Sequence, residues 1–302
     1  AAYARTLADA GANVALFNLG GIVANYPTRL PYHYHNPRLE EDLVPELIRQ
    51  LQARGIRLIG RFDFSKVNQV IGAQHPDWLY RSLQGEVVTY NGQMQCCVNG
   101  AYQQECSLAI LAEALELYPL DGVFFNMIGY QVYDYSGVYH GICQCRNCQQ
   151  RFYETTGLAL PRAEDRNDPA YRRYLGFCHA TSRELFYRIR DTIKSHQPDC
   201  ATCTYISDGI DIVRSESNSG IRRPQPEFVY DASYHIRRVR GSWPGLAASN
   251  AVVHFIDFPY RHAAVTPALT ARRLAQNFIH GGWLDYYVIG HLYQQHDRAC
   301  LP

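Results

Sequence analysis

The 302-residue sequence lacks the motifs that mark several common enzyme classes. It has no glycine-rich phosphate-binding loop, no G-x-S-x-G turn and no H-E-x-x-H helix, so serine hydrolase and zinc protease chemistry has no support. It also has little net charge, because 29 basic residues stand against 28 acidic ones. A formal charge of +1 argues against a general nucleic-acid-binding protein, so no nucleic-acid partner is expected.

Long apolar runs and a start signal are missing as well. No apolar run reaches the length that spans a bilayer, so no membrane contact is expected. The chain opens on Ala1 without a signal peptide, and AAYARTLADAGANV is typical of a helix end followed by a strand. We therefore expect the natural N-terminus to lie upstream, and the localisation stays unknown.

The sequence does contain a repeated alternation of strand and helix patterns. Seven strands are predicted, and they start near Asn13, Ile56, Gly122, Ala201, Asp211, Val252 and Tyr286. Capping residues such as Asp168-Pro169 and Thr266-Pro267 begin helices between them. This order favours an α/β fold, a (β/α)8 TIM barrel that is truncated and lacks its first strand. We expect one barrel domain over residues 1–302, with a long excursion at 65–102 and a Cys-rich loop at 128–150.

Four cysteines have the spacing of a structural metal site. Cys143, Cys145 and Cys148 form C-x-C-x-x-C, and Cys97, preferred over Cys96, is the expected fourth ligand. Four thiolates complete the tetrahedron that zinc prefers, so the pattern predicts structural Zn²⁺ without an open position, and no organic cofactor. The alternatives are buried reduced thiols or a local disulfide, although the short separation of Cys143 and Cys145 disfavours a bridge between them.

Polar side chains stand at the C-terminal ends of the predicted strands, and the active site of a barrel lies at these ends. Three of them are carboxylates and catalytic candidates: Asp63, Glu216 and Asp257. Each could instead be held in an ion pair, by Arg61 or Lys66, by Arg214 and by Arg261 respectively. The candidate substrate-binding residues are Asn126, Arg61, Tyr130, Trp78 and His291.

A loop rich in tyrosine follows the strand at Gly122. Its aromatic residues are Tyr130, Tyr133, Tyr135 and Tyr139. Flat rings with hydroxyl groups suit a neutral polyhydroxylated ligand, but the same residues could simply pack the loop.

Several segments resemble uncharacterised glycosyl-hydrolase-like barrels related to the family 42 β-galactosidases. These segments are RFDFSK, HPDW, CVNGAY, DGVFFNM, the cysteine motif and RSESN. The resemblance implies a (β/α)8 barrel that hydrolyses glycosides with retention, and it maps that family's zinc ligands onto Cys97, Cys143, Cys145 and Cys148. It places the nucleophile at or near Asp257. Asn126 matches the asparagine of the family's Asn-Glu pair, but Met127 occupies the position of the acid/base glutamate.

Two functional hypotheses follow, both with a carbohydrate partner. The first is a glycoside hydrolase that acts on a poly- or oligosaccharide or glycoside by a two-carboxylate retaining mechanism, with Asp257 and either Glu216 or Asp63. The second is a non-catalytic carbohydrate-binding barrel that has lost its acid/base at Met127. A barrel isomerase or lyase is a third hypothesis and would need a catalytic metal at the barrel mouth. The sequence leaves open whether the protein forms a homo-oligomer.

Overall fold

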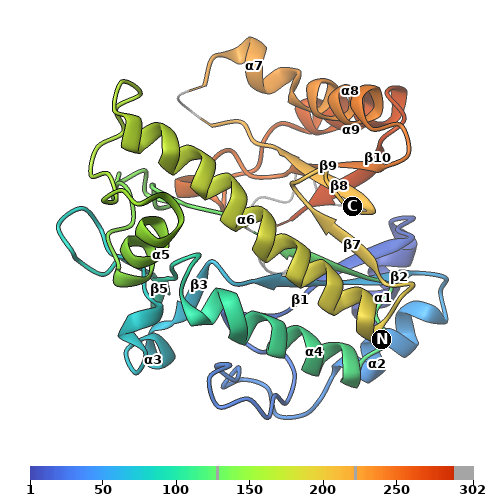
Figure 1. Ribbon diagram of the computed structural model, residues 1–302. Coiled ribbons are helices and arrows are strands. Elements are labelled where there is room, and N and C mark those ends of the chain that lie inside the picture. Colours follow the sequence, from blue (N-terminus) through green and yellow to red (C-terminus); the bar gives the residue numbers. More distant parts are fainter. Residues whose placement is uncertain (127–128, 221–222, 289–302) are drawn as a thin grey trace. The chain divides into compact units, whose positions relative to one another are not determined.

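The computed structural model describes residues 1–126, 129–220 and 223–288 (Figure 1). The chain divides into two compact units, Ala1–Cys200 and Ala201–Pro302. Two residues named above, Met127 and His291, lie outside the described residues. Within the described part of the chain, every helix is too short or too polar to cross a membrane.

Three parallel strands form the centre of the first unit. They are β1 (Val14–Gly21), β2 (Arg57–Asp63) and β6 (Gly122–Asn126), in the order β1-β2-β6. Every residue of β6 is buried, as its apolar sequence predicts for a strand covered on both faces. Gly21 is paired with Asp63, and Asp63 with Asn126, so the C-terminal ends of the three strands are level.

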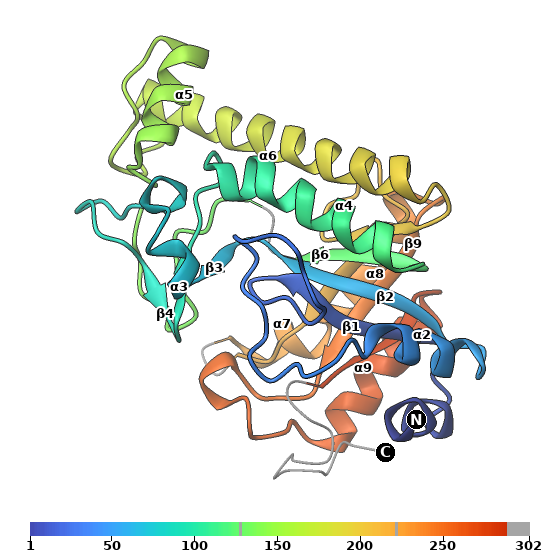
Figure 2. The same ribbon diagram turned by 90° about the horizontal axis from the view of Figure 1, so that it is seen from below.

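Helices flank these strands in the first unit. They are α1 (Ala2–Asp9), α2 (Val44–Gln52), α3 (Gln69–Gly72), α4 (Ser107–Leu117), α5 (Arg146–Thr156) and α6 (Pro169–His196), with the short helices η1 (Pro76–Trp78) and η2 (Tyr102–Cys106). Asp168 caps α6 as expected, because its side chain accepts a hydrogen bond from the Ala170 amide at 2.8 Å. The helices α4 and α6 pack against each other, side by side (Figure 2).

The excursion predicted at 65–102 forms a small sheet of its own. It holds β3 (Lys66–Asn68), β4 (Thr89–Tyr90) and β5 (Gln93–Gln95), in the antiparallel order β3-β5-β4. Asn91 and Gly92 join β4 to β5, with φ of 48° and 72°. Positive φ at both positions is what a type I′ hairpin turn requires, which explains why Asn-Gly stands there.

The second unit repeats the parallel arrangement. Its strands are β7 (Ala201–Thr204), β8 (Ile212–Ser217), β9 (Ala247–Val253) and β10 (Trp283–Tyr287), in that order and all parallel. Its helices are α7 (Gln225–Val229), α8 (Asp231–Ser242), the short η3 (Phe258–Tyr260) and α9 (Pro267–Ile279). Thr266 caps α9 through a hydrogen bond from the Leu269 amide, as the sequence predicts.

The seven predicted parallel strands are confirmed, but three boundaries were wrong. Strand β9 ends at Val253, so Asp257 lies four residues beyond it instead of closing it. Buried polar residues such as Asn250 hide the first half of β9 from a hydrophobicity pattern. Strand β10 begins at Trp283, not near Tyr286. The Cys-rich segment is a loop only up to Cys145, because α5 starts at Arg146. That both units form one closed barrel domain stays a prediction.

Candidate active site and metal centre

Asp63, at the end of β2, is held by four hydrogen bonds. Its Oδ1 accepts from the Ser65 amide at 3.0 Å and the Ser65 hydroxyl at 2.6 Å. Its Oδ2 accepts from Asn126 Nδ2 at 3.0 Å and Arg61 Nη2 at 3.2 Å. The level strand ends of β2 and β6 bring Asn126 to Asp63, so two residues predicted from their strand tips do meet.

These contacts decide the charge of Asp63. Burial raises the pKa of its carboxyl, but the charges of Arg61 and Lys66, with the hydrogen bonds from Ser65 and Asn126, outweigh burial and lower it. An ionised carboxylate cannot donate a proton, so Asp63 is poorly suited to be the acid. Arg61 also donates to Asn18 Oδ1 at 2.9 Å, and thereby ties β1 to β2.

Glu216, near the end of β8, is held at one oxygen. Its Oε1 accepts from the Tyr205 hydroxyl at 2.9 Å and from Arg214 Nη1 at 3.3 Å. No described residue donates to its Oε2, and 22% of the side chain is exposed. The ion pair with Arg214 that the sequence suggested is therefore present, and it leaves one carboxylate oxygen open.

A fourth carboxylate, Asp285 on β10, was not predicted. Its Oδ2 accepts from Arg214 Nε at 2.7 Å and from the Ser249 hydroxyl at 2.8 Å, and its Oδ1 lies 3.4 Å from Arg214 Nη2. Burial lowers the pKa of Arg214, but Asp285 and Glu216 outweigh burial and raise it, so this buried arginine stays charged. The sequence did contain a signal for Asp285, because it is an acidic residue inside the otherwise apolar run Trp283–Tyr287.

Asp257 lies in the loop after β9 and begins η3. Its Oδ1 accepts a hydrogen bond from the Phe258 amide at 2.8 Å, which caps the helical turn. Arg261, its suggested ion-pair partner, donates from Nε to the Phe258 carbonyl at 3.2 Å and stacks on the Phe258 ring.

The four predicted metal ligands come together. The sulfur atoms of Cys97, Cys143, Cys145 and Cys148 all lie within 4.8 Å of one another, and all four residues are buried. Cys97 Sγ is 3.3 Å from Cys145 Sγ and 3.3 Å from Cys148 Sγ. A disulfide would need about 2.05 Å, whereas a tetrahedral zinc ion bonded at about 2.3 Å separates its sulfurs by about 3.8 Å. This donor set could hold a metal ion.

The surroundings of the cluster also fit a thiolate-bound cation. The Asn99 amide donates to Cys97 Sγ at 3.3 Å, and Asn99 Nδ2 donates to Cys148 Sγ at 3.2 Å. Cys145 caps α5 and accepts from the Cys148 amide at 3.4 Å. Such N–H donors orient ligands and offset the charge of thiolates. Cys97, and not Cys96, belongs to the cluster, since Cys96 Sγ faces the Met94 carbonyl at 3.9 Å.

Tyr130 and Trp78 are packed into the first unit. The Tyr130 hydroxyl bonds to Asn99 Nδ2 and to Thr181 Oγ1, both at 2.8 Å, and burial raises its pKa. Trp78 is 6% exposed, and the His75 ring stacks on it at 3.7 Å between centroids. These contacts favour a packing role for both side chains.

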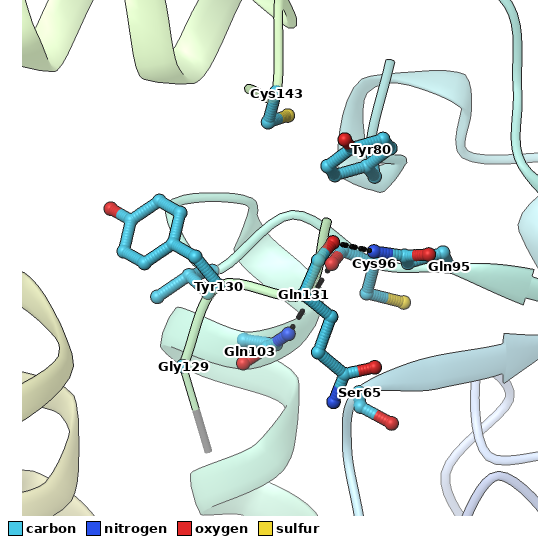
Figure 3. Close-up of a pocket in the computed structure, with 10 residues that line it drawn as sticks. Ser65, Tyr80, Gln95, Cys96, Gln103, Gly129, Tyr130, Gln131 and Cys143 are labelled. Atoms are coloured by element: carbon cyan, nitrogen blue, oxygen red, sulfur yellow. Dashed lines mark hydrogen bonds between the residues drawn. The ribbon is translucent and has the colours of Figure 1, made fainter. Parts of the chain in front are cut away.

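A cavity lies between Tyr130, Cys143 and the excursion (Figure 3). Tyr80, Cys96 and Gln103 also line it. Its volume is about 10 Å³, which leaves room for about one water molecule and none for a sugar ring.

Comparison with known proteins relates the chain to glycoside hydrolases. Residues 1–127 match the family model described as hypothetical glycosyl hydrolase 6. None of the curated proteins compared with the chain matches it in sequence. Among solved structures, an α-L-fucosidase isoenzyme from Paenibacillus thiaminolyticus superposes with a TM-score of 0.72 at 18% identity, over 99% of this chain and 44% of the fucosidase.

Two further structures have the same fold. A family 42 β-galactosidase from G. stearothermophilus matches with a TM-score of 0.67 at 12% identity, over 94% of this chain and 47% of that enzyme. The glycoside hydrolase domain of PgaB from Bordetella bronchiseptica matches with a TM-score of 0.66 at 14% identity, over 94% of this chain and 85% of that domain. The chain thus spans less than half of the fucosidase and of the galactosidase. The resemblance to glycosyl-hydrolase-like barrels is confirmed, and these identities show the fold alone.

Proposed function

We propose that the protein is a glycoside hydrolase that acts on a poly- or oligosaccharide or glycoside through two carboxylates, with retention. Glu216 and Asp257 are the proposed working pair. The match of residues 1–127 to a hypothetical glycosyl hydrolase family, together with the fold of the fucosidase and the galactosidase, supports this reaction class. Retention requires the two carboxyl groups to flank the scissile bond at about 5 to 5.5 Å from each other.

The single observation that carries the proposal is the setting of Glu216. Tyr205 and Arg214 fix its Oε1, while Oε2 accepts nothing from any described residue and the side chain reaches solvent. A carboxylate anchored at one oxygen and open at the other has a defined direction towards a ligand, which is what attack or proton transfer at a sugar requires.

Asp63, Arg61 and Asn126, at the strand ends of the first unit, are proposed to bind sugar hydroxyls, not to react. Their hydrogen bonds occupy both oxygens of Asp63, and its lowered pKa removes the proton that an acid would need. Arg61 keeps 26% of its side chain exposed, so its guanidinium can still donate to a sugar hydroxyl.

Zinc is the proposed occupant of the four-cysteine cluster. Cys97, Cys143, Cys145 and Cys148 would hold it with all four positions filled, so the ion would stabilise the segment between β6 and α5 and would take no part in the reaction.

The test is a screen of aryl glycosides with the parent protein and three variants. We expect Glu216→Gln and Asp257→Asn each to lower kcat by about 10²- to 10⁴-fold, the usual contribution of a reacting carboxyl group. The Asp63→Asn variant should show a smaller decrease in kcat. Glu227→Gln is the matched control, because Glu227 is an exposed acid of the same unit that pairs with Arg223. Full activity of both the Glu216 and Asp257 variants would contradict the assignment.

A carbohydrate-binding protein without catalysis is the second candidate. The observation that favours it is that Asp63 is held by Arg61 and Glu216 by Arg214. This candidate predicts binding of polysaccharide by the parent without turnover of any glycoside in the screen.

A further inference from the structure

The tyrosine-rich segment after β6 is an ordered hairpin, residues 130–140. The His140 amide donates to the Val132 carbonyl at 2.7 Å, and the Asp134 amide to the Val138 carbonyl at 3.1 Å. The Asp134 carboxylate accepts from the amides of Ser136 and Val138 at 2.8 and 3.0 Å, and lies 3.0 Å from His140 Nε2. These bonds fix the backbone around the turn, so its side chains have defined positions.

The hairpin is attached at the strand end that carries Asp63. The Lys66 ammonium lies 4.6 Å from the centre of the Tyr135 ring, and it donates to Ser65 Oγ at 3.3 Å. Ser65 in turn donates to Asp63. Gln95 Nε2 adds a bond to the Gln131 carbonyl at 2.7 Å. The hairpin therefore stands beside the C-terminal end of β2, where Asp63 lies.

Two of its tyrosines face solvent instead of the protein. Tyr133 and Tyr139 lie opposite each other across the hairpin, with ring centroids 5.1 Å apart at 55°, and they are 58% and 42% exposed. The Tyr139 hydroxyl donates to Glu164 Oε1 at 2.7 Å, which fixes that ring. Exposed aromatic faces that are held in place, not mobile, are typical of a binding surface.

We propose that Tyr133 and Tyr139 form a stacking subsite for a neutral glycan chain. This inference rests on the proposed function and extends it, because it names a neutral glycan chain as the class of ligand. The rings offer apolar faces to the C–H faces of sugars. Asp134 and Glu164 place two carboxylates next to the pair, and His140 bonds to Asp134, while the Lys66 ammonium lies on the Tyr135 ring of the same hairpin. The carboxylates beside the two rings disfavour an acidic polysaccharide or a nucleic acid.

The test combines binding and kinetics. Native gels cast with neutral soluble polysaccharides (galactan, mannan, xylan and β-glucan) measure retardation, and hydrolysis of the retarding polysaccharide is compared with that of a short aryl glycoside. We expect Tyr133→Ala to weaken retardation about tenfold or more, and to lower kcat/KM for the polysaccharide more than for the aryl glycoside. Tyr139→Phe keeps the ring and should retain most of the binding.

Tyr153→Ala is the matched control, because Tyr153 is 63% exposed on α5 in the same unit but lies outside the hairpin. It should leave retardation unchanged. Retardation that depends on Tyr133 without hydrolysis of any glycoside would support this subsite and contradict the hydrolase. Hydrolysis without retardation of the parent by any of the four polysaccharides, or retardation that survives Tyr133→Ala, would overturn the subsite. Near-ultraviolet circular dichroism of each variant excludes unfolding as the cause.

Discussion

Arg214 is the residue on which the polar interior of the second unit depends. Its guanidinium contacts Asp285 through two nitrogens and Glu216 through a third, and its side chain is only 7% exposed. The two partly exposed carboxylates offset the cost of burying the Arg214 cation, and removal of the cation leaves two neighbouring acids to repel each other.

We therefore predict that Arg214→Gln lowers the free energy of unfolding by about 1.5 to 3 kcal/mol, the usual contribution of hydrogen bonds to charged groups, because the carboxylates left behind are partly exposed. Urea unfolding followed by circular dichroism measures it. Arg238→Gln, an exposed arginine on α8 in the same unit, should cost less than about 0.5 kcal/mol. Equal losses in the two variants would show that Arg214 does not support the network.

At the scale of elements, the segment from β6 to α5 depends on sulfur ligands. Cys145 both caps α5 and belongs to the cluster of four sulfurs. Because α5 starts at one of these cysteines, binding of a metal ion would also stabilise the first turn of the helix.

We predict about one zinc ion per chain in the purified protein, by inductively coupled plasma mass spectrometry. The Cys97→Ser variant should lose this zinc and melt at a lower temperature. A chelator added under denaturing conditions should also remove the zinc. The control is Cys96→Ser, the adjacent buried cysteine outside the cluster, which should keep the zinc. A full complement of zinc in Cys97→Ser would rule out the assigned ligands.

At the scale of the whole molecule, stability should depend on pH through His33. Burial lowers the pKa of His33 from 6.5 to about 4, against the opposing charge of Glu113 and with a small contribution from His35. His33 Nε2 accepts a hydrogen bond from the Gly21 amide at 3.1 Å, which requires the neutral ring. The folded state thus binds fewer protons than the unfolded state between these pH values.

We predict that the free energy of unfolding is highest above about pH 6.5 and falls by up to about 3 kcal/mol as the pH drops to about 4. Asp63 adds a further loss in stronger acid, because its lowered pKa means that its contribution disappears only as it is protonated. Urea titrations at several pH values measure the slope of the free energy of unfolding against pH. In His33→Gln the slope between pH 6.5 and 4 should shrink, and an unchanged slope would exclude His33 as its source.

The sequence by itself determined the features that depend on residues close together in the chain. The Asn91-Gly92 turn, the caps at Asp168 and Thr266, and the buried strand at Gly122 all follow from local backbone preference and hydrophobic pattern. The choice of Cys97 also came from the sequence, since metal ligands must be close enough to converge on one ion.

Only the tertiary structure decided which partners the charged groups have. Asp63 meets Asn126 across 63 positions, and Arg214 meets Asp285 across 71. Such contacts depend on the register of neighbouring strands, and register is set by packing between segments, which no local pattern contains. Asp257 was predicted at a strand end and lies in a helical cap instead, because buried polar residues hid the start of β9 from the hydrophobic pattern. The residue types in the sequence identify the candidate groups, whereas the register of the strands determines which of these groups contact each other.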